Sequence, residues 1–142
     1  MSSQVAVITG GAQGIGKQTA HVLNDLGWSL VLLDLQEVDV TIYKDAMSLV
    51  GDITSEVFVQ SAVDATIKRF GRVDALVNNA GISCISAALD TPADLYRKVL
   101  DVNLVAPFLL AKAFGKVMID AGIGAVINVA SVAGMQLSLI HI

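Results

Sequence analysis

The chain alternates short, continuously apolar runs with longer segments in which apolar residues recur at helical spacing. Runs of four or five apolar residues favour buried strands, and a spacing of three or four residues favours helices. The runs predict strands at residues 5–9, 30–33, 47–50, 73–77 and 125–129. The periodic segments predict helices at residues 14–26, 55–70 and 91–119.

Glycine and proline mark where these elements begin and end. Gly27 and Gly71 follow the first two predicted helices, where a left-handed residue commonly ends a helix. Thr91 is predicted to cap the third helix, with Pro92 in its first turn. Pro107 lies inside that helix and predicts a kink or a break, because proline lacks the backbone N–H.

Alternating strands and helices favour a parallel sheet that is covered by helices on both faces. Right-handed crossovers then predict a doubly wound, Rossmann-type α/β sheet with strand order 3-2-1-4-5, incomplete at its C-terminal side. The link between Asp34 and Asp52 is short and rich in poor helix formers, so its helix is expected to be stunted or missing.

The composition narrows the class of protein. Hydrophobic residues make up 54% of the 142 residues and charged residues 15%, which excludes intrinsic disorder. A net charge of −4 argues against a nucleic-acid partner. The single cysteine, Cys84, cannot form an internal disulfide or a thiolate metal site.

Polar residues interrupt the apolar stretch after Asp120, and the N-terminus does not resemble a signal peptide. We expect a cytoplasmic protein with no metal and no membrane span.

A glycine-rich turn, Thr9-Gly10-Gly11-Ala12-Gln13-Gly14-Ile15-Gly16, follows the first strand and opens the first helix. Glycines allow a sharp turn and the close approach of a pyrophosphate. The helix N-terminus presents unpaired N–H groups and a partial positive charge to the anion. The turn therefore predicts a dinucleotide site.

Asp34 ends the second strand, 18 residues beyond Gly16. A carboxylate at this position accepts hydrogen bonds from the adenosine ribose and repels a 2′-phosphate, so NAD is favoured over NADP. The alternative is a structural turn with a solvated Asp34.

Five motifs in order resemble those of the classical short-chain dehydrogenases/reductases, whose cofactor motif is T-G-x-x-x-G-x-G. They run from residue 9 to residue 131. After the glycine-rich turn they are Gly51-Asp52-Ile53-Thr54, Asn78-Asn79-Ala80-Gly81, Asp101-Val102-Asn103-Leu104 and Val126-Ile127-Asn128-Val129-Ala130-Ser131.

The resemblance implies a set of cofactor contacts. Asp52 and Ile53 would contact the adenine, and residues 79–81 would line the cofactor's ribose. The implied contacts are Thr9, Gly10, Gln13, Gly14, Ile15, Gly16, Asp34, Asp52, Ile53, Asn79, Ala80 and Gly81. Asn78 would hold the central strands together.

The resemblance also implies two catalytic residues, Asn103 and Ser131. Asn103 would perturb its helix so that a water joins a proton relay, and Ser131 would stabilise charge on the substrate oxygen. Structural alternatives remain open at this stage. Asp52 can be the cap of the next helix, Asn103 a satisfied buried amide, and Ser131 a turn or cap hydroxyl.

The family pairs a Tyr acid/base with a Lys four residues later, and the 142 residues contain no such pair. Met47 and Leu100 stand four residues after Tyr43 and Tyr96. We interpret residues 1–136 as a partial NAD-binding domain. Residues 137–142 are interpreted as a non-native tail, whose codons resemble a transposon end used in sequencing libraries; a genuine short C-terminus is the alternative.

The full-length parent is predicted to be an NAD-dependent oxidoreductase that interconverts an alcohol and a ketone, assembled as a homodimer or homotetramer. A non-catalytic dinucleotide-binding fragment or regulatory module is the alternative. An epimerase or dehydratase of the extended branch ranks lower, because that branch prefers T-G-x-x-G-x-x-G.

The 142-residue chain should show no appreciable dehydrogenase activity, because hydride transfer at a carbinol carbon needs a group that takes or gives the hydroxyl proton. The measurement is NAD reduction at 340 nm by the purified chain with a panel of alcohols. Turnover that depends on NAD would contradict this expectation.

Overall fold

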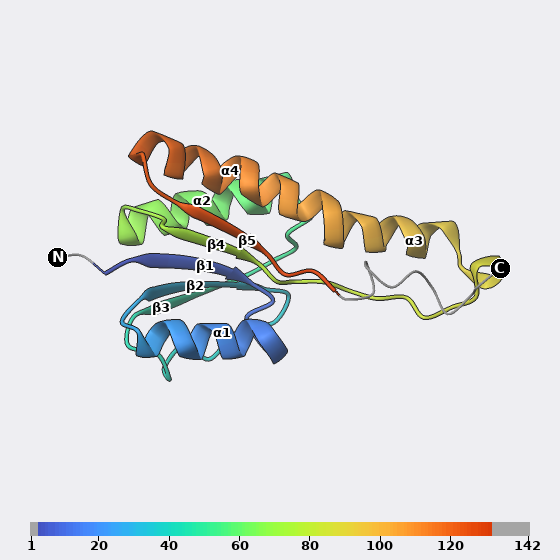
Figure 1. Ribbon diagram of the computed structural model, residues 1–142, viewed down its shortest axis with the longest axis horizontal. Helices are drawn as coiled ribbons and strands as arrows, with labels where there is room; N and C mark the ends of the chain where they lie inside the picture. Colours follow the sequence, from blue (N-terminus) through green and yellow to red (C-terminus); the bar gives the residue numbers. More distant parts are fainter. Residues whose placement is uncertain (1–2, 132–142) are drawn as a thin grey trace.

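The computed structural model describes residues 3–131 (Figure 1). The interpreted tail at residues 137–142, and the last part of the interpreted domain, lie outside the described residues. The strands are β1 (Val5–Thr9), β2 (Ser29–Asp34), β3 (Ala46–Val50), β4 (Ala75–Asn78) and β5 (Ala125–Asn128). The helices are α1 (Gly14–Asp25), α2 (Glu56–Phe70), α3 (Ala93–Leu100) and α4 (Ala106–Ala121).

Within residues 3–131 the strands form one parallel sheet in the order β3-β2-β1-β4-β5, which confirms the predicted topology. Val7 pairs with Val31 of β2 on one side and with Leu76 of β4 on the other. Since the chain leaves β1 toward β2 but returns beside it as β4, the switch point lies between β1 and β4. In such sheets, ligands bind beyond the carboxyl ends of the strands at this point.

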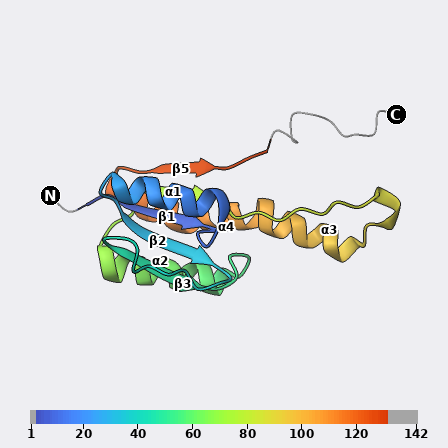
Figure 2. The ribbon, with the colours of Figure 1, turned by 90° about the horizontal axis from the view of Figure 1, so that it is seen from below.

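Successive strand residues point to opposite faces, which gives the sheet two cores. Val5 and Val7 face α2 and α4, whereas Ala6 and Ile8 face α1. Figures 1 and 2 show α1 on one face of the sheet and α2 with α4 on the other. Strands buried on both faces explain why β1 and β2 are continuously apolar in the sequence.

The long predicted helix is interrupted, but not at the proline. A π-helical turn, Asp101–Val105, separates α3 from α4, and Pro107 stands in the first turn of α4. The amide of Ala106 donates to the carbonyl of Asp101, five residues earlier. Pro107 has no N–H, so the carbonyl of Asn103 lacks the donor that an α-helix would supply. The proline is tolerated because the irregular turn comes before it.

Two further details of this region differ from the sequence-based expectation. Pro92, rather than Thr91, is the N-cap of α3, and the Thr91 hydroxyl instead donates to the Ala87 carbonyl. The helical run Ala93–Ala121 is long and apolar enough to cross a membrane, a test that core helices of soluble proteins also pass. Here its α4 part packs on the sheet through residues at four-residue spacing: Ala106, Leu110, Phe114 and Met118.

The described link between β2 and β3 contains no helix, as predicted. Its apolar residues Val38 and Tyr43 are buried against the α1 face of the sheet. The side-chain oxygen of Asn24 in α1 accepts a hydrogen bond from the amide of Lys44 at 2.9 Å. The link therefore covers β2 and β3 without a helix of its own.

Asp74 stands just before β4, and its side chain is hydrogen-bonded to the start of β1. Its buried carboxylate accepts the amide of Val5 at 2.8 Å and Nε of Arg72 at 2.9 Å. Burial alone would raise the pKa of the Asp74 carboxyl, but these two hydrogen bonds and the guanidinium charge lower the pKa below its ordinary value of 3.8.

Because the pKa of Asp74 is lower in the folded state, its contribution to stability is complete above pH 3.8 and is lost as the pH falls through the folded value. Asp74→Asn should lower the free energy of unfolding at pH 7 by about 2 kcal/mol. It should also flatten the loss of stability below about pH 4, since the carboxylate no longer titrates. Urea unfolding between pH 2 and pH 7 measures both effects.

Asp45→Asn is the matched control, because the Asp45–Arg69 ion pair is about half exposed on both sides. This variant should lose less than about 1 kcal/mol. Equal losses of unfolding free energy in the two variants would contradict the role of Asp74 as a buried hydrogen-bonding link between β4 and β1.

Candidate active site

The glycine-rich turn connects β1 to α1 at the carboxyl edge of the sheet. Gly10 and Gly14 adopt left-handed conformations, with φ of 69° and 56°. Gln13 is the N-cap of α1, and among the described residues no side chain hydrogen-bonds to this cap. The first amides of α1 are thus left for another acceptor, which suits a phosphate group.

Gly16 is required by close approach rather than by its backbone angles. A Cβ at Gly16 would stand 2.2 Å from the Gly10 carbonyl oxygen and 2.5 Å from Nδ2 of Asn79. A Cβ at Gly10 would also stand 2.9 Å from the same amide nitrogen. The last and first glycines of the motif therefore make room for Asn79.

Asn79 and Thr9 fasten the end of β4 to the glycine-rich turn. Nδ2 of Asn79 donates to the carbonyls of Thr9 at 2.9 Å and Gly10 at 3.3 Å. In return, the Thr9 hydroxyl oxygen accepts the amides of Asn79 at 3.0 Å and Ala80 at 2.9 Å. Asn79 was expected to line the cofactor's ribose, and its side-chain nitrogen also holds the turn in place.

Asp34 lies next to the turn, at the end of β2. Its two carboxylate oxygens accept separate backbone amides, Ala12 at 3.0 Å and Gln36 at 3.1 Å. The side chain is half-buried. A carboxylate is thus held at the edge of the turn, 22 residues away from Ala12 in the sequence.

Asp52 and Ile53 follow β3 on the far side of β2. Ser55, not Asp52, caps α2, so the capping alternative for Asp52 is wrong. The exposed Asp52 carboxylate instead accepts the amide of Thr54 at 2.9 Å and its hydroxyl at 2.7 Å, and these bonds lower the pKa of Asp52. Ile53 is buried beneath α2.

A cavity of about 660 Å³ opens at the switch point, between the glycine-rich turn, the end of β4, α4 and the end of β5. Its size is typical of small-molecule sites. Of the expected site residues it brings together Ile15, Asn79, Ala80, Gly81, Asn103 and Ser131. The remaining expected residues, which do not line it, are Thr9, Gly10, Gln13, Gly14, Gly16, Asp34, Asp52 and Ile53.

Asn103 belongs to the π-helical turn and links it to the loop after β4. Its side-chain oxygen accepts the amide of Ile82 at 2.9 Å, and its nitrogen donates to the Ile82 carbonyl at 2.8 Å. Asn103 is exposed, so the alternative of a buried amide is wrong. Both the oxygen and the nitrogen of the side chain thus bind the loop.

Sequence reasoning assigned no role to six residues that line the cavity: Leu104, Phe108, Ala111, Asn128, Val129 and Ala130. The signal for Asn128 was present, since it is a polar residue inside the apolar run of β5. In the sequence, Leu104 and Phe108 occupy ordinary helix positions. Only the packing of α4 beside β5 turns them toward the cavity.

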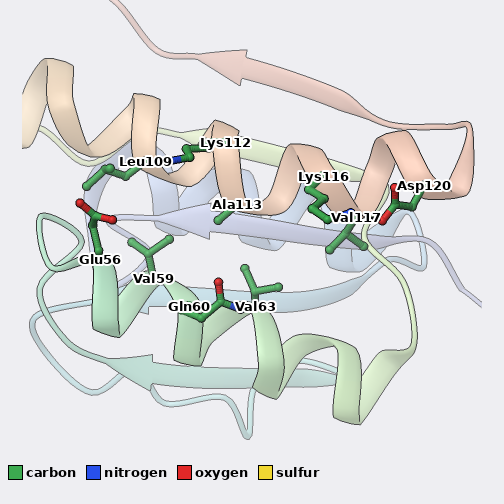
Figure 3. Close-up of a pocket in the computed structure, with 10 residues that line it drawn as sticks. All are labelled: Glu56, Val59, Gln60, Val63, Leu109, Lys112, Ala113, Lys116, Val117 and Asp120. Atoms are coloured by element: carbon green, nitrogen blue, oxygen red, sulfur yellow. Dashed lines mark hydrogen bonds and ion pairs between the residues drawn. The ribbon is translucent and has the colours of Figure 1, made fainter.

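A second hollow of about 450 Å³ lies between α2 and α4. Figure 3 shows its apolar floor, to which Val59, Val63 and Val117 contribute, and charged side chains at its margin. It shares no residue with the first cavity and contains none of the expected site residues. In residues 3–131, no group of three or more His, Cys, Asp or Glu side chains is placed to hold a metal ion.

Two helical glycines should respond oppositely to alanine. Gly16→Ala should destabilise the protein by about 1–3 kcal/mol, because its Cβ collides with backbone that cannot move freely. Gly115→Ala should stabilise it by about 0.5–1 kcal/mol, since no described heavy atom lies within 4 Å of that Cβ. Urea unfolding of both variants tests the pair; stabilisation by Gly16→Ala would refute the close approach.

Comparisons with known proteins agree with this geometry. The model of the short chain dehydrogenase family matches residues 4–141. An NAD-dependent glycerol dehydrogenase of Listeria innocua is 34% identical, over 95% of this chain and 55% of its own length. Momilactone A synthase of Oryza sativa is 41% identical, over 92% and 50%. The chain thus spans about half the length of these curated relatives.

Solved structures give the same assignment. A metagenomic short-chain oxidoreductase in complex with NADP is 33% identical and superposes with a TM-score of 0.88, over 95% of this chain and 64% of that one. With its sheet order, its glycine-rich turn and its match to the family model over nearly the whole length, the chain belongs to the short-chain dehydrogenase family.

Proposed function

We propose that this chain forms the dinucleotide-binding part of an NAD-dependent oxidoreductase that interconverts an alcohol and a ketone. The observation that carries the proposal is the hydrogen bond from the Ala12 amide in the glycine-rich turn to the Asp34 carboxylate at the end of β2. It joins the two groups that a dinucleotide needs, a set of phosphate-binding amides and a ribose acceptor.

The residues at the turn fit such a cofactor. Gly14 opens onto space in which a Cβ would meet nothing within 4 Å, and the uncapped amides at the start of α1 suit a diphosphate. Asp34 would hydrogen-bond to the ribose hydroxyls and repel a 2′-phosphate, which favours NAD over NADP. Among the relatives, the glycerol dehydrogenase is NAD-dependent, whereas the metagenomic structure holds NADP.

Bound NAD would supply a hydride acceptor at the cavity. Ser131, at the end of β5, would hydrogen-bond to the substrate oxygen and stabilise its developing charge. Asn103 would act through its helix, because the carbonyl that Pro107 cannot cap is available to hold a water of the proton relay. Asp52 and Ile53 would contact the adenine.

A second candidate is a non-catalytic dinucleotide-binding module. It would share the glycine-rich turn and Asp34 with the first candidate. Both candidates require cofactor binding, and they differ in turnover by the protein in which this chain occurs.

We also propose a cytoplasmic location and a homodimer or homotetramer in the full-length protein. Ile119 of α4 is exposed on the side away from the buried stripe, where a partner subunit would cover it.

Replacing Asp34 by Ser together with Leu35→Arg should reverse the cofactor preference. NADPH should bind more tightly by about tenfold or more. The carboxylate that repels the 2′-phosphate is removed at position 34, and a guanidinium that binds phosphate is added at position 35. NADH should bind more weakly by a similar factor, since its ribose acceptor is gone. Fluorescence titration of the folded chain with each reduced cofactor measures both.

Asp39→Ser is the matched control, because Asp39 is an exposed carboxylate of the same link and hydrogen-bonds only to Thr41 among the described residues. It should leave both affinities unchanged. Absence of NADH binding by the folded wild-type chain would overturn the proposed function, and unchanged preferences in the double variant would remove Asp34 from the site.

A further inference from the structure

Asn78 and Asn128 form a side-chain pair across the last two strands. They stand opposite each other in the parallel register of β4 and β5. Nδ2 of Asn78 donates to Oδ1 of Asn128 at 2.8 Å. Both residues line the cavity, so the pair lies in its wall.

Asn78 connects three elements at this point. Its backbone carbonyl accepts the amide of Val129 at 2.9 Å, which extends the β4–β5 ladder by one bond. Its side-chain nitrogen also approaches the carbonyl of Pro107 at 3.5 Å, at the start of α4. The short bond to Asn128 is therefore the stronger of the two side-chain contacts of Nδ2.

Burial makes this bond important for Asn78. The residue is 4% exposed, and its Oδ1 has no hydrogen-bond partner among the described residues. A buried amide that also lost its Nδ2 partner would have almost no hydrogen bonding left, which is costly in a site shielded from water. Asn78 thus holds Asn128 firmly.

The three residues after Asn128 form part of the cavity wall. Val129, Ala130 and Ser131 all line the cavity, and Ser131 stands three residues after Asn128. By contrast, β5 is exposed along its whole length and is paired on one side only within the described sheet. Among the described strands, β5 is joined to the sheet through β4, so a contact between the ends of these two strands bears on where residues 129–131 lie.

We propose that Asn128 is a positioning residue, whose bond to Asn78 fixes the end of β5 and so places Ser131 against the cavity. This deepens the proposed function and rests on it, because the placement matters only if Ser131 contacts a substrate. The direction of the bond matters as well: Asn78 donates and residue 128 must accept.

The test compares three variants. Asn128→Leu keeps the size of the side chain but removes the acceptor. Asn128→Asp retains an acceptor oxygen and should restore the bond. Val126→Leu is the matched control, because Val126 stands two residues earlier on the same face of β5 and does not line the cavity.

Amide hydrogen exchange of the purified chain reports the anchor directly. Exchange at the Val129 amide should be about tenfold faster in Asn128→Leu. It should stay near the wild-type rate in Asn128→Asp and Val126→Leu. An unchanged rate in Asn128→Leu, or a faster rate in Asn128→Asp as well, would overturn the proposal. If Asn128→Leu does not fold, Asn128→Ala carries the same comparison.

Kinetics of the full-length protein separate positioning from general destabilisation. Asn128→Leu should lower kcat by about tenfold or more and leave NADH affinity within about twofold. Asn128→Asp restores the acceptor but adds a charge to the cavity wall, so it is compared by hydrogen exchange alone. Parallel losses of kcat and NADH affinity would overturn the positioning role. If the wild-type protein binds no NADH and has no turnover, the proposed function fails, while the exchange data still decide whether the anchor exists.

Discussion

The site depends on the polar contact between the end of β1 and the segment that follows β4. Thr9 and Asn79 exchange hydrogen bonds through both backbone and side chains, directly behind the glycine-rich turn. Because β1 and β4 border the switch point of the sheet, this contact sets the distance between the turn and the far wall of the cavity. An uncharged network suits this place, since an uncompensated charge next to the proposed phosphate site would alter its electrostatics.

Asn78, the last residue of β4, and Asn79, which follows it, divide this task by strand geometry. Adjacent residues of a strand point to opposite faces, so Asn78 reaches α4 and β5 while Asn79 reaches the turn. Asn103 holds the loop after β4 to the π-helical turn in a similar way, through both polar atoms of its side chain. Amides suit these joints because each can donate and accept at once without carrying charge.

Sequence reasoning succeeded where a local pattern has one physical solution. Apolar runs such as Val5–Thr9 predicted strands buried on both faces, and Ser55 to Gly71 marked both ends of α2. It failed where two local solutions compete. Thr91 and Pro92 both suit a helix start, and the cap falls on Pro92. The interruption predicted from Pro107 is present, as the π-helical turn Asp101–Val105 just before it. Neighbouring elements decide where such helices begin and end. The loop that Asn103 holds determines where α3 ends and α4 begins.

The sequence by itself determined the family, the order of the strands and the position of the glycine-rich turn, because each rests on residue types at fixed local spacing. Only the tertiary structure decided which expected residues share the cavity and which stand apart from it, as Asp52 does. It also decided that Asn79 fastens the turn and that Asn128 faces Asn78. Such pairings join residues 50 to 70 positions apart, and no local pattern encodes the register that brings them together.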